Sequence, residues 1–191
     1  FVYDEKAVTM KELVLALAAD WQGYEDLRTL ILKRGTFFGN DDEYADTLAV
    51  RIYDDLVKAI EGHPNTRGGK TQLNMLSTTC HNYFGSVCGA TPNGRFAHFA
   101  ISDGTSPSHG SDTNGPTSVV RSLGKLDQTK GGGTLLNVRF LPSLLKRDED
   151  VAKLGKLVRE YFKLGGHHIQ FNIVDTETSA VSFAFEESLA A

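Results

Sequence analysis

The stretch Ser102-Asp-Gly-Thr-Ser-Pro-Ser-His-Gly-Ser-Asp-Thr-Asn-Gly-Pro-Thr117 constrains the fold of this chain more than any other segment. It holds too much Gly, Ser and Asp to run through as a helix or strand, and it is too irregular for a low-complexity linker. Its glycines permit backbone angles that other residues avoid, and its prolines fix theirs. A long loop specified this closely within a compact domain is usually functional.

The sequence on both sides of this loop predicts regular elements. Helices are predicted to begin at Thr9, where Thr9-x-x-Glu12 forms a capping-box pattern, and then at Tyr24, Asp41, Pro116 and Asp148. In the last of these, the residues expected to face inward are Val151, Leu154, Val158, Tyr161 and Phe162. Strands are predicted over residues 71–76, 134–140 and 167–174, and a second extended segment is predicted around residues 81–84. Alternating strands and helices indicate the α/β class.

Composition excludes several classes of function. The 191 residues carry a net charge of −4, which gives no basic surface for nucleic acid. No apolar run approaches the ~18–20 residues that span a bilayer, and the start shows no signal-peptide pattern. Two cysteines, Cys80 and Cys88, are too few for a disulfide framework. We therefore expect a cytoplasmic, reducing setting without membrane or nucleic-acid partners.

Several segments, taken in order, resemble the C-terminal part of the glycyl radical enzymes. They are Phe38-Gly-Asn-Asp-Asp42, Asn65-Thr-Arg-Gly-Gly-Lys70, Gly94-Arg95 with the 102–117 loop, Gly132-Gly-Thr-Leu-Leu-Asn137 and Gly166-His-His-Ile-Gln-Phe-Asn172. Motifs in family order are far more specific than any one of them. The resemblance extends over residues 1–177 and is greatest to the dehydratase and decarboxylase branch related to pyruvate formate-lyase.

The resemblance implies an incomplete α/β fold, the C-terminal part of a ten-stranded α/β barrel in which two finger loops meet at the centre. Residues 1–103 would end the pyruvate formate-lyase-like barrel domain, and residues 104–191 would form a glycine radical domain truncated before its radical glycine. In the family, a radical S-adenosylmethionine activating enzyme abstracts hydrogen from a backbone glycine on one loop. That glycyl radical generates a thiyl radical on a cysteine of the other loop, and the thiyl radical takes hydrogen from the substrate.

Neither radical carrier is expected in this sequence. The family's radical glycine lies in a pattern like Arg-Val-x-Gly-Tyr, and residues 175–191 contain no such pattern. The thiyl cysteine would lie before residue 1, because neither Cys80 nor Cys88 has its combination of adjacent Gly and following Glu. We therefore expect truncation or a shifted reading frame, no catalytic residue, no bound cofactor and no activity from this chain alone.

Thr78 is the candidate substrate-binding residue. It follows the predicted strand over 71–76, and the resemblance places a matching threonine near the substrate pocket of the dehydratase branch. The alternative is that Thr78 and Thr79 are strand formers that satisfy local backbone groups.

The 102–117 loop also has two interpretations. Its glycine-rich turns could bind an anion, or, as the resemblance implies and we favour, the loop supports the radical loop from beneath.

Two further clusters suggest chemistry. A metal hypothesis rests on Cys80, His81, Cys88, His167 and His168. We expect no metal, because adjacent strand residues point to opposite faces and the cysteine spacing is not that of a zinc site. Hydrogen bonds within the barrel are the expectation for His168 and Gln170.

The acidic run Asp41-Asp42-Glu43 could serve as an acid–base pair, but consecutive carboxylates at a helix start are more often caps. The lone Trp21 and the pair Phe37-Phe38 are expected to pack in the core.

The sequence therefore predicts a fragment of a glycyl radical lyase that cleaves a C–O, C–N or C–C bond of a small polar substrate, typically by dehydration. One alternative is a fragment of a pyruvate formate-lyase-type acyltransferase. Another is a non-catalytic scaffold or binding protein that keeps the barrel walls. The expected partners are the missing N-terminal part of the enzyme, the activating enzyme and a second copy in a homodimer. Unpaired strand edges and apolar surface predict poor solubility for the chain by itself.

Overall fold

The computed structural model describes residues 1–173. These residues form two compact units, which we describe separately. The first unit consists of Phe1–Gly35 and Thr79–Ile101, and the second consists of Thr36–Thr78 and residues 102–173. No helix within residues 1–173 is both long enough and apolar enough to cross a membrane.

The first unit contains three helices, α1 (Met10–Ala18), α2 (Glu25–Arg34) and α4 (Cys80–Val87). The predicted capping box begins α1, because the Thr9 hydroxyl accepts from the Glu12 amide while the Glu12 carboxylate accepts from the Thr9 amide at 2.8 Å. Trp21 is buried in the core of this unit, as predicted, and its indole N–H donates to the carbonyl of Arg95 at 3.1 Å. The core of this unit forms around Ala16, Trp21 and Ile31.

Helix α4 corrects one prediction. The sequence analysis predicts an extended segment around residues 81–84, but these residues lie within a helix. The physical reason is tertiary, because Gly85 on this helix lets another segment approach closely. A Cβ on Gly85 would lie 2.4 Å from the backbone oxygen of Phe99. Strand propensity is a weak prior that such packing overrides.

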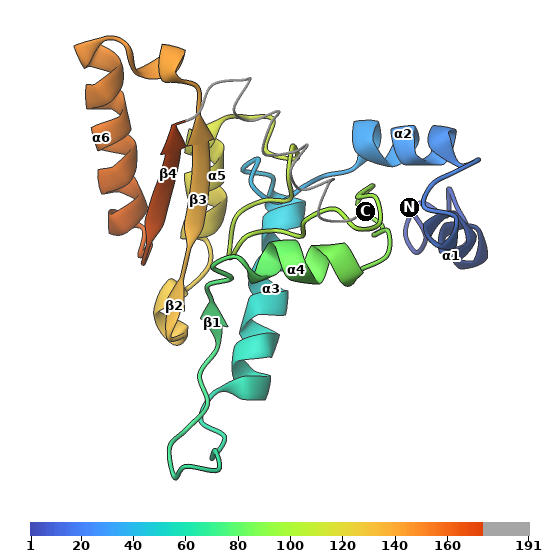
Figure 1. Cartoon of the computed structure of the whole chain (residues 1–191), viewed down its shortest axis with the longest axis horizontal. Coiled ribbons are helices and arrows are strands. Elements are labelled where there is room, and N and C mark those ends of the chain that lie inside the picture. Colours follow the sequence, from blue (N-terminus) through green and yellow to red (C-terminus); the bar gives the residue numbers. More distant parts are fainter. Residues whose placement is uncertain (174–191) are drawn as a thin grey trace. The chain divides into compact units, whose positions relative to one another are not determined.

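The second unit is built around parallel strand pairs (Figure 1). Helix α3 (Glu43–Ile60) leads to β1 (Asn74–Met75), and α5 (Pro116–Gly124) leads to β2 (Gly133–Thr134) and β3 (Leu136–Phe140). Helix α6 (Asp148–Lys163) then connects β3 to β4 (Ile169–Ile173), and short 3-10 turns occupy Gln128–Lys130 and Pro142–Leu145. Strand β1 pairs in parallel with β2, and β3 pairs in parallel with β4. Parallel strands joined by a crossing helix confirm the α/β prediction.

Two strands differ from their predicted extents. The strand expected over residues 71–76 is reduced to Asn74–Met75. The strand expected over residues 134–140 is divided at Leu135 into β2 and β3. Leu135 donates its amide to the carbonyl of Met75 at 3.0 Å, whereas the next residue, Leu136, donates to His168 at 2.9 Å. The chain therefore changes its pairing partner at this point.

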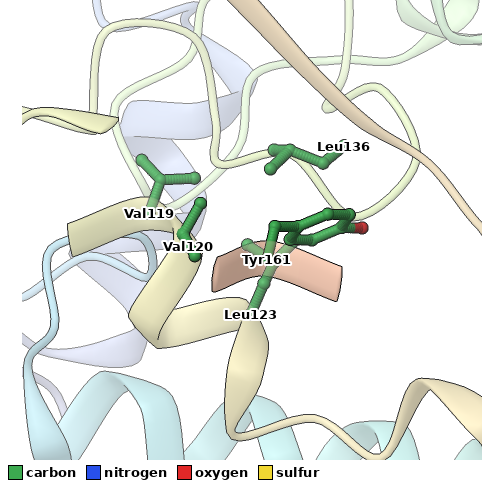
Figure 2. Close-up of a cluster of buried hydrophobic side chains, with 5 residues drawn as sticks. All are labelled: Val119, Val120, Leu123, Leu136 and Tyr161. Atoms are coloured by element: carbon green, nitrogen blue, oxygen red, sulfur yellow. The ribbon is translucent and has the colours of Figure 1, made fainter. Parts of the chain in front are cut away.

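The hydrophobic core of the second unit lies between α5, α6 and the β3–β4 sheet (Figure 2). Its buried members are Val119, Val120, Leu123, Leu136 and Tyr161. Phe38 packs against this cluster, as predicted, together with Leu157 and Leu164 of the α6 region.

The inward face of α6 is partly different from the predicted one. Val151 and Phe162 are about half exposed, at 54% and 49%. Leu157, Tyr161 and Leu164 form the inward stripe instead, at the i, i+4 and i+7 spacing of one helix face. Two glycines follow the end of α6, where Gly165 adopts φ of +90° and the amide of Gly166 donates to the carbonyl of Tyr161 at 2.9 Å.

The buried side-chain amide of Gln128 holds Tyr161 in place within this core. The Tyr161 hydroxyl lies 3.1 Å from both the Gln128 side-chain oxygen and the His168 carbonyl. Thr134 donates its hydroxyl to the same Gln128 oxygen at 2.6 Å, and the Gln128 amide donates to the carbonyl of Leu123. Burial raises the pKa of Tyr161, which keeps the hydroxyl protonated as a donor.

Candidate functional site

The β3–β4 sheet has one apolar and one polar face. The register pairs Leu136 with Ile169 and continues to Phe140 with Ile173, so alternate residues of both strands share a face. The apolar face carries Leu136, Val138, Phe140, Ile169, Phe171 and Ile173, and it contains the residues that pack toward α5 and α6. The polar face carries Asn137, Arg139, Gln170 and Asn172, and the strand predicted over residues 167–174 is confirmed as β4 over Ile169–Ile173.

The polar face is the part of this sheet on which chemistry can occur. In a barrel whose helices cover the outside, the opposite face of each strand points to the interior. Arg139 and Gln170 are exposed in the described part of the chain, whereas Asn137 and Asn172 are half-buried. We therefore take this face and the groups that contact it as the candidate site.

The 102–117 loop closes the second edge of β3. Thr105 donates both its amide and its hydroxyl to the carbonyl of Leu135, at 2.9 and 2.8 Å. The amide of Asn137 donates to the Ser106 hydroxyl at 2.9 Å. Leu135 and Asn137 point their backbone groups away from β4, so the loop satisfies groups that a neighbouring strand would otherwise bind. These contacts support the structural interpretation of the loop.

Gly104 allows this close approach. Its φ of +58° is in the left-handed region, where a side chain is disfavoured. A Cβ at this position would lie 2.6 Å from the oxygen of Leu135 and 2.8 Å from the oxygen of Met75, both of them backbone atoms. A larger residue would therefore push the loop away from both β1 and the start of β3.

A buried carboxylate connects the loop to the polar face. Asp103 is 6% exposed, and its Oδ1 accepts a hydrogen bond from the hydroxyl of Ser77, which follows β1. Its Oδ2 accepts from the Nδ2 of Asn137 at 2.7 Å. The Oδ1 of Asn137 in turn accepts from the Nδ2 of Asn172 at 2.5 Å. We call Ser77, Asp103, Asn137 and Asn172 the polar relay.

Sequence reasoning did not identify the polar relay. In the sequence, Asp103 and Asn137 stand out only as members of two separate motifs, the 102–117 loop and the segment that ends at Asn137. The available signal was the alternation of Leu-Asn-Val-Arg-Phe over β3, which matches that of Ile-Gln-Phe-Asn-Ile over β4. Two adjacent strands that each alternate apolar and polar residues predict one polar face.

Thr78 lies directly after Ser77, at the end of the segment that contains β1. It is exposed and adopts φ of +52°. Positive φ is unusual for a β-branched residue, and strained backbone of this kind clusters at functional sites. The substrate-binding role of Thr78 stays a prediction.

The acidic run at residues 41–43 has a structural role at the start of α3. Asp42 is the N-cap, and its Oδ1 accepts from the amide of Ala45 at 3.0 Å. Asp41 instead pairs with Lys125, at 3.3 Å. Lys125 also lies 2.8 Å from the carboxylate of Asp46, a fully buried residue that sequence reasoning missed. The hydrogen bond to Asp46, followed in effect by those to Glu43 and Asp41, raises the pKa of Lys125.

The residues of the metal hypothesis fall in different units. Cys80, His81 and Cys88 belong to the first unit, and His167 and His168 belong to the second. Within residues 1–173, no group of three or more His, Cys, Asp or Glu side chains is arranged to hold a metal ion. The tail in which the radical glycine was sought, residues 175–191, lies outside the described residues.

Two family models match successive parts of this sequence. Residues 1–85 match the pyruvate formate lyase-like family, and residues 101–182 match the glycine radical family. The trans-4-hydroxy-L-proline dehydratase of Clostridioides difficile is 45% identical over 174 residues, which cover 91% of this chain. The chain belongs to the glycyl radical enzyme family. The isethionate sulfite-lyase of Bilophila wadsworthia, also similar, is 38% identical over 93% of the chain.

Solved glycyl radical enzymes show the same fold. The crystal structure of hydroxyproline dehydratase from Clostridioides difficile with bound trans-4-hydroxy-L-proline matches 98% of this chain with a TM-score of 0.91 and 41% identity. The B12-independent glycerol dehydratase from Clostridium butyricum matches with a TM-score of 0.86 and 37% identity. The family's α/β barrel is thus confirmed as the fold class. The chain spans 22% of the length of the two relatives compared by sequence and 24% of these two solved chains.

Proposed function

We propose that this chain supplies one wall of the substrate chamber in a glycyl radical lyase that acts on a small polar substrate, with dehydration as the reaction type. The observation that carries the proposal is the polar face of β3–β4, held by the polar relay and backed by a core against α5 and α6. The similarity to a dehydratase and a sulfite-lyase supports this reaction class.

We propose that the described residues position the substrate and exclude water, and do not themselves carry a radical. Radical chemistry requires that the reacting atoms be positioned and that water be excluded. The described residues supply a rigid surface, in which the loop holds the edge of β3 and the polar relay holds two amides in place. Thr78 is proposed as the residue of this wall that hydrogen-bonds substrate. Residues 1–103 would end the barrel domain, and residues 104–191 would belong to the glycine radical domain.

The radical carriers and partners belong to the same proposal. A glycyl radical is the group that the glycine radical family implies. We propose that an activating enzyme using S-adenosylmethionine installs it, that the thiyl cysteine is supplied by a preceding part of a longer enzyme, and that two copies of that enzyme form a dimer. Within the described residues, Cys80 is exposed and Cys88 is half-buried, and both are free thiols.

A chimera tests the proposal. Residues 1–173 of this chain would replace the matching segment of the Clostridioides difficile trans-4-hydroxy-L-proline dehydratase, with the parent enzyme as control. After anaerobic activation, we expect a glycyl radical signal in electron spin resonance and dehydration of trans-4-hydroxy-L-proline. A folded chimera that forms the radical but no product would favour the scaffold alternative. A folded chimera without a radical would contradict the assignment to a radical lyase.

A further inference from the structure

We propose that Asp103 is a positioning residue that sets the direction of the polar relay, so that Asn172 presents its carbonyl oxygen to the substrate chamber. The relay then selects substrates that place a hydroxyl or ammonium donor against β4. This inference rests on the proposed function, because it assigns the polar face to the chamber. It goes further by naming the residue that determines whether that face presents a hydrogen-bond acceptor or a donor to the substrate.

The direction of the relay follows from the chemistry of its first member. An ionised carboxylate only accepts hydrogen bonds, whereas an amide side chain can donate with its nitrogen or accept with its oxygen. Asp103 is buried, so water cannot supply a hydrogen bond to its carboxylate if the neighbouring side chain presents an acceptor instead of a donor. Asn137 must therefore turn its Nδ2 toward Asp103, and this is the contact observed at 2.7 Å.

The orientation of Asn137 then fixes the next amide. With its nitrogen committed to Asp103, Asn137 can offer only its oxygen to Asn172, which donates its Nδ2 to that oxygen at 2.5 Å. The Oδ1 of Asn172 is consequently directed away from Asn137. A substrate that meets Asn172 from the chamber thus finds an acceptor, which suits a hydroxyl or an ammonium group.

The other side of Asp103 makes the arrangement rigid. Ser77 donates its hydroxyl to Oδ1 of Asp103, and the hydroxyl oxygen of Ser77 accepts from the amide of Gly104 at 3.1 Å. The donor of Ser77 is thereby directed to the carboxylate by the loop backbone. The relay therefore connects the end of β1, the loop, β3 and β4, and its hydrogen bonds are directed toward Asp103 from both sides.

The test uses Asp103→Asn and the double variant D103N/N137D in the chimera described above. Asparagine at 103 gives its oxygen to the Ser77 hydroxyl and therefore meets Asn137 with its nitrogen, so Nδ2 of Asn137 loses its acceptor and its orientation is no longer fixed. Loss of one oriented hydrogen bond, worth about 1 kcal/mol, should raise the KM for trans-4-hydroxy-L-proline about fivefold. The yield of glycyl radical and kcat should change little.

The double variant is the matched rescue. An aspartate at 137 only accepts, so Asn172 must again donate its nitrogen and present its oxygen, and KM should return toward the unmutated value. If the two side chains acted independently of each other, the effects of the two substitutions would add and KM would not recover. An unchanged KM in Asp103→Asn, or a double variant worse than the single one, would overturn the proposal.

A second readout separates this inference from the proposed function. Hydrogen exchange of the β3 and β4 amides reports local stability whether or not the chimera turns over. The relay predicts faster exchange in Asp103→Asn and restored protection in D103N/N137D. Restored protection without any turnover would uphold the relay and contradict the proposed function, whereas active protein with no loss of protection in Asp103→Asn would contradict the relay.

Discussion

Replacement of Gly104 by alanine should loosen the loop that closes the edge of β3. Two costs combine at this position. The left-handed backbone, with φ of +58°, costs a residue with a Cβ about 1–2 kcal/mol. The new methyl group would also meet the backbone oxygens of Leu135 and Met75 at 2.6 and 2.8 Å, and such overpacking adds about 1–3 kcal/mol.

Gly110→Ala is the matched control for this substitution. Gly110 belongs to the same loop and also has positive φ, of +75°, but a Cβ there meets nothing within 4 Å. Both variants therefore carry the backbone cost, and only Gly104→Ala carries the steric one. The difference of about 1–3 kcal/mol corresponds to about 5- to 150-fold in an opening equilibrium.

Hydrogen exchange of a peptide that spans β2 and β3 measures this difference, in the chimera or in the chain by itself. We expect exchange near Leu135 and Asn137 to accelerate far more in Gly104→Ala than in Gly110→Ala. Equal acceleration in the two variants would show that the close approach of Gly104 to the two carbonyl groups does not hold the loop. The structural interpretation of the loop would then be wrong.

Three further predictions concern single side chains. Lys125→Met should lower the free energy of unfolding by about 3 kcal/mol, because it leaves the buried carboxylate of Asp46 without its cation. Adding D46N to this variant should recover part of the loss in chemical denaturation, and no recovery would contradict the pairing of the two residues. The pKa of Lys125 is raised above 10.5 in the folded state, so its stabilisation is complete below pH 10.5 and declines as pH rises through the raised value. Alkaline titration of unfolding should show a steeper decline with Lys125 than with Met at this position, because Lys130 and Tyr161, whose pKa values are also raised, contribute equally to both proteins. In the chimera, Thr78→Val should raise KM while Thr78→Ser keeps it near the parent value, and equal KM values would remove Thr78 from the site.

Local signals in the sequence were sufficient for the described helices other than α4. The Thr9-x-x-Glu12 box, the proline at 116 and the glycine at 165 each mark a helix end by a mechanism confined to a few residues. Helix α4 was predicted wrongly because its conformation depends on the contact of Gly85 with a segment near Phe99. Such a contact is not visible in a local pattern.

The candidate site shows the same limit. Alternation along β3 and β4 predicts a polar face, but the pairing of Asn137 with Asp103 joins residues 34 positions apart. Likewise, the division of the strand at Leu135 arises from Thr105 and Met75, which approach it from different segments. Sequence motifs identified the family, whereas the directed relay required the register and the loop together.

A crystal structure of the chimera with bound trans-4-hydroxy-L-proline would test the central claim most directly. The account predicts that the polar face of β3–β4 lines the chamber, with the Oδ1 of Asn172 directed toward a donor group of the substrate and the Nδ2 of Asn137 still on Asp103. A substrate enclosed entirely by other walls, with this polar face turned to solvent or to a second subunit, would contradict it.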